Sequence, residues 1–263
     1  MINFLIQVYR SIFARKVFFK FNKLLFRLSL SGLGILNSRN AKESGETAFL
    51  RSYLGQNEHA GFVLDVGANR GDYTLMCLQE NSKIKVISFE PHPKTFQKLV
   101  QNLRGKEVRL VNMAMGGRAG TIQLYDYSTN DGSAHASVYK EVIEKIHREH
   151  SISHSVEVST IDYFLKQENI DKVELLKIDT EGNELEVLKG SLDAIQKKKI
   201  KAIHFEFNEM NVVSRCFFKD FFSILIDYDF YRLLPDGMIK IDRYTPLYCE
   251  IFAYQNIVAL LRI

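Results

Sequence analysis

The chain has 263 residues, of which 46% are hydrophobic and 25% charged, so it can bury the core of one domain of roughly 200 residues beside a short appendage. Its three cysteines are far apart and lack C-x-x-C spacing, which argues against a disulfide framework and a thiolate zinc site and fits a reducing cytoplasm. The net charge of +4 is uneven: residues 1–42 hold eight Lys and Arg and no acid, whereas the remainder holds 27 basic and 31 acidic residues, with no basic stripe for nucleic acid.

The first segment, residues 1–30, predicts a basic amphipathic helix. Its basic stripe comprises Lys16, Lys20, Lys23 and Arg27, and an apolar stripe on another face comprises Phe18, Phe21, Leu25 and Leu28. Charges interrupt every apolar stretch before it reaches the ~18 residues of a membrane span, and no clean signal-peptide cleavage site follows. Two interpretations stay open: the helix packs on the domain, or it associates peripherally with an anionic membrane.

After a polar connection, short apolar runs alternate with helical patterns, which is typical of a parallel sheet with helices on both faces. Strands are expected at Phe62–Gly67, Lys85–Glu90, Val108–Met113, Glu174–Asp179 and Lys201–Phe207. Helices are expected at Glu46–Leu54, Tyr73–Glu80, Lys94–Leu103, Leu185–Ala194 and Phe217–Ile226. The pattern predicts an N-terminal helical extension over residues 1–58 and an α/β domain over residues 59–263.

Two stretches depart from this alternation. Within residues 116–160, Thr121–Tyr127 predicts a strand and Val138–His150 a helix, and this insertion is a candidate lid over a substrate. At the end of the chain, Tyr231–Leu234 and Ile251–Leu261 predict two strands without a long helix between them. A closing antiparallel hairpin is therefore expected.

A glycine turn follows the first strand, at the edge where open α/β sheets bind ligands. Gly67-Ala68-Asn69-Arg70-Gly71 joins that strand to a helix whose free N–H groups and positive dipole end favour an anionic group. The next strand ends at Glu90, 23 residues after Gly67, so a carboxylate suited to the two hydroxyls of a ribose is expected beside the turn. A dinucleotide site would favour G-x-G-x-x-G, whereas Asn69 stands in place of the second glycine. These features favour S-adenosylmethionine (SAM), which has no phosphate, over NAD.

Four motifs in matching order carry a resemblance to a known family. They are Leu64-Asp-Val-Gly-Ala-Asn-Arg-Gly-Asp-Tyr73, Phe89-Glu-Pro-His-Pro93, Thr160-Ile-Asp162 and Leu176-Lys-Ile-Asp-Thr-Glu-Gly182. Together they resemble the FkbM family of SAM-dependent methyltransferases, from about Ala41 to the C-terminus. The resemblance implies an α/β, Rossmann-like class I methyltransferase fold with a mostly parallel seven-stranded sheet and a C-terminal antiparallel hairpin. It also implies SAM as methyl donor and O-methylation of a hydroxyl.

The same resemblance implies, by position, which residues contact the cofactor. The methionine end would be surrounded by Asp65, Gly67, Ala68, Asn69, Gly71 and Tyr73. The ribose would lie at Glu90 and Pro91, the adenine edge at Asn112 and Ala114, and Ser133 would contact adenine or the acceptor. Arg70 stands where the family often has an aliphatic residue, and Thr180 replaces a common valine.

Methyl transfer requires an acceptor oxygen aligned with the methyl group, and a hydroxyl acceptor also benefits from a base. The candidate bases at the carboxyl edge of the sheet are Asp179, Glu181, His204 and Glu206, of which Asp179 and Glu181 are favoured. Structural interpretations compete with these roles: Glu181 would cap the following helix, Asp179 would accept loop N–H groups, and His204 would be a satisfied core residue.

His147, His150 and His154 have spacings that could place three imidazoles on one side of a helix. Arg148 and Glu149 lie between them and favour a solvated polar end, so no metal site is predicted. The leading hypothesis is a cytoplasmic SAM-dependent O-methyltransferase for a small-molecule, glycan, glycolipid or secondary-metabolite acceptor, working at the inner face of the membrane. The alternative is a membrane-peripheral scaffold that keeps the fold without turnover.

Overall fold

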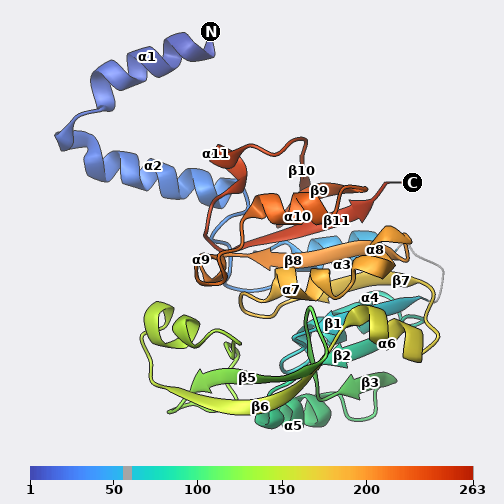
Figure 1. The fold of residues 1–263 in the computed structure, drawn as a ribbon. Coiled ribbons are helices and arrows are strands. Elements are labelled where there is room, and N and C mark those ends of the chain that lie inside the picture. The colour runs from blue at the N-terminus through green and yellow to red at the C-terminus, as the bar shows by residue number, and fades with distance from the viewer. Residues whose placement is uncertain (56–60, 263) are drawn as a thin grey trace.

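A computed structural model describes residues 1–55 and 61–262, which form a central sheet with helices on both faces, a small second sheet and a helical arm (Figure 1). Within these residues the main sheet has eight strands in the order β10-β9-β11-β8-β7-β1-β2-β3. They are β1 (Phe62–Val66), β2 (Lys85–Phe89), β3 (Val108–Val111), β7 (Val173–Ile178), β8 (Ile200–Phe207), β9 (Tyr228–Leu234), β10 (Gly237–Ile241) and β11 (Gln255–Leu261).

The directions of the strands confirm the predicted class I methyltransferase fold. Strands β3, β2, β1, β7 and β8 are parallel, and β11 runs antiparallel between β8 and β9. The sequence missed β10, which pairs with β9 as an additional edge strand. Because β2 and β3 lie on one side of β1 and the later strands on the other, the winding reverses between β1 and β7, where open α/β sheets bind their ligands.

Three neighbouring strands end at the same level of the sheet. Val66 of β1 is in register with Phe89 of β2 and with Ile178 of β7. The residue that follows each of them therefore leaves the sheet at one common edge, close to the other two.

Helices cover both faces of the sheet because successive strand residues point to opposite sides. The helices are α3 (Glu46–Leu54), α4 (Asp72–Glu80), α5 (Pro93–Asn102), α6 (Ile161–Gln167), α7 (Glu184–Lys189), α8 (Leu192–Gln196), α9 (Met210–Ser214), α10 (Phe218–Ile224) and α11 (Pro246–Cys249). Leu64 of β1 belongs to the core beneath α6, α7, α8 and α10, whereas its neighbour Val63 packs with α3 and α4 on the other face.

The helix expected at Leu185–Ala194 is two short helices, because the chain turns at Gly190. A Cβ on Gly190 would lie 2.1 Å from the carbonyl oxygen of Gly116, so the backbone of the insertion passes directly against this turn. The Gly190 carbonyl accepts a hydrogen bond from the backbone N–H of Asp162 at 2.9 Å, and the N–H of Ala194, its partner in a continuous helix, donates to Oδ1 of Asp162 at 2.8 Å instead.

The strand expected at Thr121–Tyr127 is present in the insertion, but it belongs to a second sheet that was not expected. Strands β4 (Ala114–Met115), β5 (Gly120–Tyr127) and β6 (Ser151–Ser159) pair in the order β4-β6-β5. The expected helix over Val138–His150 is limited to η2 (Val142–Ile146), a π-helical turn that buries Val142 and Ile143.

The N-terminal segment is an arm of two helices, α1 (Ile2–Phe13) and α2 (Phe19–Gly32), joined through the 3-10 turn η1 (Lys16–Phe18). Helix α1 has no buried residue and α2 buries only Leu30, so packing of this segment on the domain is not observed. Figure 1 shows the arm projecting away from the sheet domain. No helix within the described ranges is long and apolar enough to cross a membrane.

The extension predicted over residues 1–58 includes α3, which packs as part of the sheet domain. Phe49, Leu50 and Leu54 of α3 are fully buried and pack with α4 and the sheet. The boundary expected between residues 58 and 59 falls outside the described residues.

Candidate active site

A cavity of about 480 Å³ lies beyond the carboxyl ends of β1, β2, β7 and β8, in the size range of small-molecule sites. One side, the glycine side, is lined by Gly67, Asn69, Glu90, Pro91, Met113, Ala114 and Met115. The other side, the acidic wall, is formed by Asp179, Glu181, Glu206 and Glu209. The insertion adds Ser133, His135 and His147 to the lining, so the segment expected as a lid borders the cavity.

The glycine turn is shaped by its contacts with neighbouring strands and helices. Gly67 has φ +82°, and a Cβ there would lie 1.7 Å from the carbonyl oxygen of Asp179. Gly71 has φ +90° and lies against Leu99 of α5 and against Leu103, which directly follows that helix. Gly67 has no space for a side chain, and the positive φ at Gly71 disfavours one there; the close packing at Gly67 holds the tips of β1 and β7 together.

Glu90 lies directly beside the turn, as its place at the tip of β2 predicts. Its Oε2 accepts the backbone N–H of Asn69 at 2.9 Å, and its Oε1 accepts that of His92 at 2.8 Å. Burial raises the pKa of Glu90 to about 7 against these two hydrogen bonds. Each carboxylate oxygen has further lone-pair capacity, so both can still accept a hydroxyl from the cavity.

A buried lysine lies behind the acidic wall, and sequence reasoning missed it. Nζ of Lys177 lies 3.7 Å from Oδ2 of Asp179 and 3.6 Å from Oε1 of Glu46, with no hydrogen-bond partner among the described residues. Burial would lower the pKa of Lys177, but the carboxylates of Asp179, Glu46, Glu206 and Asp65 raise it above its ordinary value. Lys177 thus faces four carboxyl groups, and burial raises the pKa of Glu206 well above its ordinary value and that of Asp65 to about 6, which reduces the negative charge that these two contribute. Strand register could have indicated this lysine, because Lys177 of β7 lies opposite Asp65 of β1.

Glu181 makes a direct pair with His135 of the insertion. Nδ1 of His135 lies 3.1 Å from Oε1 of Glu181, and the hydroxyl of Ser137 donates to the Glu181 carbonyl at 2.8 Å. Burial raises the pKa of Glu181 to about 7, and the hydrogen bond to Glu181 raises the pKa of His135. With Nδ1–H donating to the carboxylate, Nε2 of His135 is left as a proton acceptor in the cavity wall.

Glu184, rather than Glu181, satisfies the turn before α7. Its Oε1 accepts the backbone N–H groups of Thr180 and Gly182, both at 3.0 Å. The structural interpretation expected Glu181 to cap the following helix. Glu184 accepts the N–H groups before that helix instead. Glu181 itself has φ +53°, an uncommon conformation for a non-glycine residue, and its carboxylate is left to the cavity.

His147 adds a second imidazole to the same wall. Its Nδ1 lies 2.6 Å from the hydroxyl of Tyr127, and its ring centre lies 5.2 Å from that of His135. Its buried Nε2 has no hydrogen-bond partner among the described residues. The spacing that suggested a metal on one helix face does not hold, because His147 and His154 lie on different elements.

His204 does not reach the cavity. It is fully buried, with Nδ1 2.8 Å from the Tyr73 hydroxyl and Nε2 2.9 Å from Oδ1 of Asn256. Burial keeps its pKa well below the ordinary value, so the ring is neutral. This is the satisfied core histidine of the structural alternative: it shares a face with Glu206 but lies two residues farther from the strand tip.

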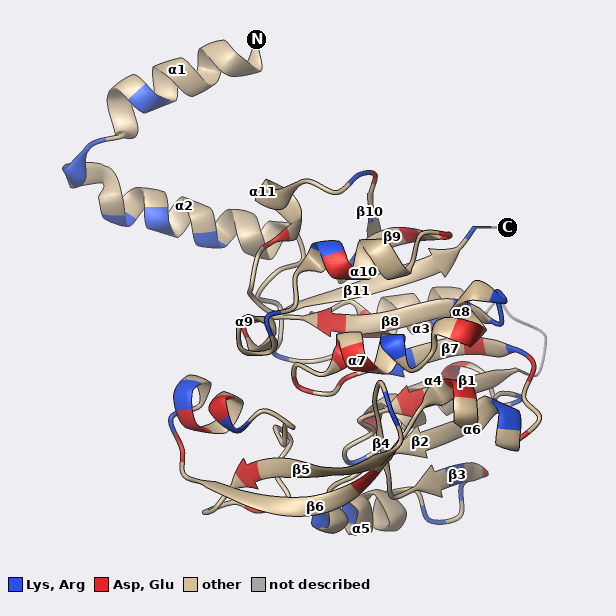
Figure 2. Cartoon of the chain, viewed as in Figure 1, with Lys and Arg blue, Asp and Glu red and all other residues tan. Residues whose placement is uncertain are grey.

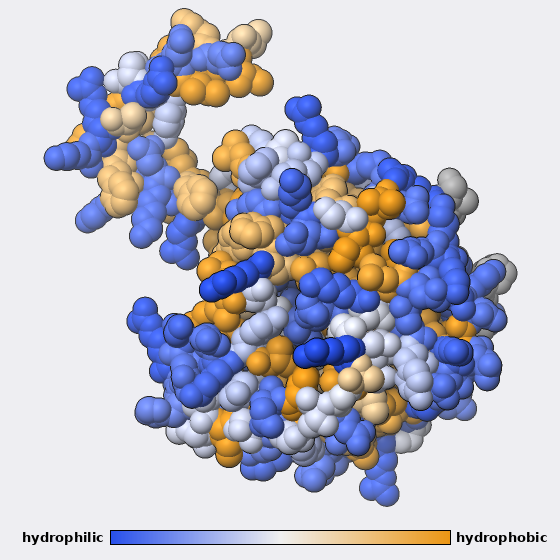
Figure 3. Space-filling model, in the orientation of Figure 1, coloured by the Kyte–Doolittle hydropathy of each residue, from blue (hydrophilic) through white to orange (hydrophobic). Residues whose placement is uncertain are grey.

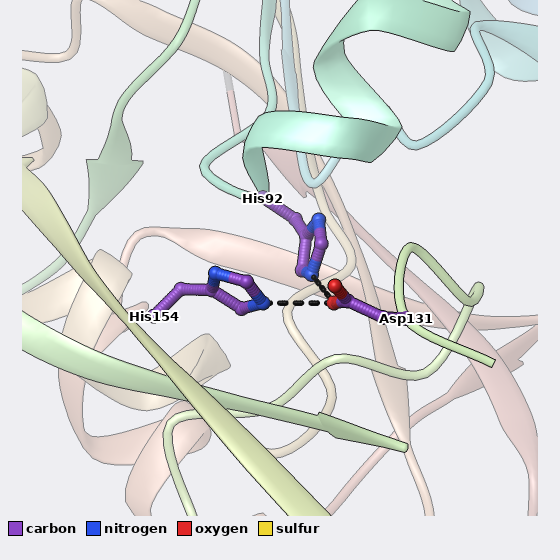
Figure 4. Close-up of side chains that lie close together, drawn as sticks. All are labelled: His92, Asp131 and His154. Atoms are coloured by element: carbon purple, nitrogen blue, oxygen red, sulfur yellow. Dashed lines mark hydrogen bonds and ion pairs between the residues drawn. The ribbon is translucent and has the colours of Figure 1, made fainter. Parts of the chain in front are cut away.

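His92, Asp131 and His154 converge outside the cavity and have the donor types of a metal site (Figure 4). Nε2 of His92 lies 2.9 Å from Oδ1 of Asp131, and Nε2 of His154 lies 2.7 Å from the same oxygen. However, Nδ1 of His92 accepts the backbone N–H groups of Lys94 and Thr95 at the start of α5. The neutral ring therefore carries its proton on Nε2, whereas a ligating histidine normally donates from its other nitrogen. The trio fits a hydrogen-bonded brace between α5, β6 and the loop before Ser133.

The residues predicted from sequence divide into two sets. Those lining the cavity are Gly67, Asn69, Glu90, Pro91, Ala114, Ser133, Asp179, Glu181 and Glu206. Those outside its lining are Asp65, Ala68, Gly71, Tyr73, Asn112 and His204. Most of the second set supports the first: Asn112, for example, donates from Nδ2 to the carbonyls of Glu90 at 2.8 Å and Pro91 at 3.1 Å.

Comparison with known proteins finds a match to the methyltransferase FkbM domain over residues 65–230. Hexuronic acid methyltransferase AglP of Haloferax volcanii is 31% identical over 58% of this chain and 59% of its own length. Methyltransferase sdnD of Sordaria araneosa is 27% identical over 49% and 60%, and 2-O-methyltransferase NoeI of Sinorhizobium fredii is 24% identical over 57% and 64%. The chain thus spans about three fifths of the length of the relatives it matches.

Proposed function

This chain belongs to the FkbM methyltransferase family, and on that premise we propose that it transfers the methyl group of SAM to a hydroxyl of a glycan, glycolipid or secondary metabolite. The observation that carries this proposal is a single cavity in which Glu90, beside the glycine turn, and the Glu181–His135 pair lie on opposite sides. The first group is suited to bind a nucleoside and the second to accept a proton.

The charge of the cavity suits SAM, the cofactor of this class of domain. SAM carries a sulfonium and an ammonium group against one carboxylate, so its net charge is positive. The acidic wall offers the carboxylate of Asp179 and, above about pH 7, that of Glu181, with Lys177 behind them. Oδ1 of Asn69 is buried and has no partner among the described residues, which leaves an acceptor at the turn for the ammonium group.

The proposed contacts follow from the lining of the glycine side. Glu90 would accept the two ribose hydroxyls, and Gly67 with Asn69 would contact the methionine end. Pro91, Ala114 and Ser133, together with Met113 and Met115, would surround the adenine. Asp65, Ala68, Gly71, Tyr73 and Asn112 would act indirectly, by fixing the turn and the strand tips.

SAM supplies a methyl group already activated on sulfur, so the protein has to align the acceptor and remove its proton. We assign proton removal to Nε2 of His135, with Glu181 holding the ring through Nδ1. Proton uptake makes the imidazolium, which the adjacent Glu181 carboxylate stabilises. Asp179 and Glu206 would hold the acceptor and the cationic cofactor.

The acceptor that fits the acidic wall is rich in hydroxyl groups. The side-chain oxygens of Asp179, Glu206 and Glu209 can each accept hydrogen bonds from such hydroxyls. Two of the similar proteins are named for methylation of a hexuronic acid and for 2-O-methylation, which supports a sugar hydroxyl as the target class. A lipid-borne acceptor at the inner face of a membrane is part of this proposal.

Two measurements test the proposal. Calorimetry with purified protein should detect binding of SAM and of its demethylated product, and failure of both to bind would contradict the cofactor assignment. A labelled methyl group from SAM should then pass into one of the glycan, lipid or small-molecule fractions of a cell extract. Binding of SAM without transfer into any fraction would favour the alternative, a membrane-peripheral scaffold with a noncatalytic fold.

A further inference from the structure

The arm formed by residues 1–32 presents an apolar surface that nothing in the rest of the described chain covers. More than half of the exposed large hydrophobic residues in the described ranges lie within its first 28 residues. Phe4 is 67% exposed and Phe26 is 61% exposed, values that a soluble surface rarely tolerates in a contiguous patch. Figure 3 shows hydrophobic surface, coloured orange, along the arm.

The arm is internally ordered, so its exposed residues are held in place rather than loose. The ring of Phe13 contacts Tyr9, Phe18 and Phe21, with centroid distances of 4.8, 5.0 and 5.6 Å. Nδ2 of Asn22 donates to the carbonyl of Phe13 at 2.9 Å across the bend. The two helices therefore hold a defined angle at η1.

The charge of the arm is entirely positive. It contains Arg10, Arg15, Lys16, Lys20, Lys23 and Arg27 and no Asp or Glu, and the structure shows no ion pair for these six within the described residues. In Figure 2 the ribbon of α1, η1 and α2 has blue segments and no red segment. A partner with apolar depth beneath a negative surface would satisfy both features, and an anionic lipid bilayer has that chemistry.

The length of the helices decides how they can meet a bilayer. A helix of the 12 residues of α1 is about 18 Å long, well short of a hydrocarbon core of about 30 Å. We propose that α1 and α2 lie in the interface of an anionic membrane, with their apolar residues among the acyl chains and their basic residues at the headgroups. The arm is then a two-helix interfacial anchor.

The position of the arm's base connects this anchor to the cavity. Leu30 and Ile35 are buried where α2 joins the domain, and Leu36 donates its backbone N–H to the carbonyl of Tyr254 at 2.7 Å. Both Tyr254 and Ser38 line the cavity. An arm bound to the membrane would thus hold the cavity close to the lipid surface. That this position serves methylation of a lipid-borne acceptor rests on the proposed function.

The first test measures binding of the full chain to vesicles. With vesicles of phosphatidylglycerol and phosphatidylcholine in equal parts, we expect co-sedimentation that weakens with salt and is lost with phosphatidylcholine alone. Combining Lys20→Glu, Lys23→Glu and Arg27→Glu should weaken binding on the order of a hundredfold. The matched control reverses three exposed charges on the domain, Arg104→Glu, Lys106→Glu and Arg118→Glu, and should bind as the parent does.

The second test uses the absence of tryptophan from the chain. A single Phe26→Trp reporter on α2 should shift its fluorescence to shorter wavelength on the same anionic vesicles, whereas Tyr163→Trp, exposed on α6, should not. Equal shifts at both positions, or none at Phe26→Trp, would overturn the proposal. So would vesicle binding that survives the triple charge reversal on α2.

A second copy of the chain is the competing occupant of the apolar surface. Sedimentation of the parent without lipid should show no association that depends on the arm. If Leu24→Ser with Leu28→Ser dissolves a stable dimer while anionic vesicles fail to bind the parent, the arm is a dimerisation element and the membrane proposal is wrong. None of these measurements needs SAM, so they stand apart from the test of methyl transfer.

Discussion

Glu90 and Glu181 lie on opposite sides of one cavity and share an unusual property by different means. Burial raises the pKa of each carboxyl to about 7. Glu90 is held by two backbone N–H groups, so its position is fixed and it has no proton-transfer partner. Glu181 is held by the titratable ring of His135. Under the proposed function, one residue type would thus serve binding on one side and proton transfer on the other.

The largest effect of a substitution is expected at the His135–Glu181 pair, where it tests whether this side of the cavity accepts the proton. His135→Ala should lower kcat by roughly a thousandfold, within the range of general-base catalysis, because no other group takes the proton from the acceptor. Glu181→Gln should lower kcat by a smaller factor, since the ring stays but loses its charged partner. Both variants should bind SAM with nearly unchanged Kd. Rate measurements at saturating SAM test this, with His150→Ala, an exposed histidine of the same insertion, as control.

Unchanged turnover in His135→Ala would remove the pair from the mechanism and return the role of base to Asp179 or Glu206. A loss confined to the Kd of SAM would mean that the pair belongs to cofactor binding, and the distinction between the two sides would fail.

The opposite result is expected for Glu90. Glu90→Ala should weaken SAM binding on the order of a hundredfold, because two charge-assisted hydrogen bonds from the ribose are lost and the N–H groups of Asn69 and His92 lose their acceptor. Calorimetry gives the Kd directly, and Glu107→Ala on an exposed turn serves as the matched loss of a carboxylate. Wild-type affinity in Glu90→Ala would show that the cofactor does not lie beside the glycine turn.

The dependence of Kd and of kcat on pH should also distinguish the two sides of the cavity, with a smaller effect than the substitutions above. Each carboxyl acts when deprotonated, so both effects are complete above about pH 7 and decline as pH falls below it. The Kd of SAM should rise up to tenfold per pH unit through Glu90, and kcat should fall with a similar slope through the His135–Glu181 pair. In Glu90→Gln the slope in Kd should disappear while that in kcat remains. Loss of both slopes in that variant would show that one group controls both.

Much of the glycine side could be predicted from sequence because its geometry is local. Gly67 and Glu90 each follow a short apolar strand, and parallel pairing brings the ends of neighbouring strands to one edge. The same logic placed Asp179, Glu181 and Glu206 correctly at that edge. It could not tell how far below the edge a side chain lies, which is why His204 was assigned to the site although Tyr73 covers it.

The acidic wall was harder to predict because its partners come from distant parts of the chain. His135 is 46 residues from Glu181 and lies in an insertion whose second strand, β6, was not expected. Lys177 has no motif of its own and gains its importance from Glu46, which α3 brings from outside the predicted domain. Such pairings depend on how the insertion and α3 pack, and periodicity carries no information about that.

The smallest effect is expected from a substitution in the brace of His92, Asp131 and His154, which tests whether the two sides of the cavity depend on each other. These side chains join the start of α5, just after Glu90, to the loop that carries Ser133 and His135, so they connect the two sides. In the native protein, burial raises the pKa of Asp131, but hydrogen bonds from Lys94 and His154 outweigh burial and lower this pKa to about 2. Asp131→Asn keeps the shape of the side chain but removes the negative charge to which both imidazoles are hydrogen-bonded. We expect Kd for SAM and kcat each to worsen by about fivefold, since a single charged hydrogen-bond network is weakened. A change in only one of the two would show that the brace supports one side alone, and added Zn²⁺ should not restore either value if His92 keeps its proton on Nε2.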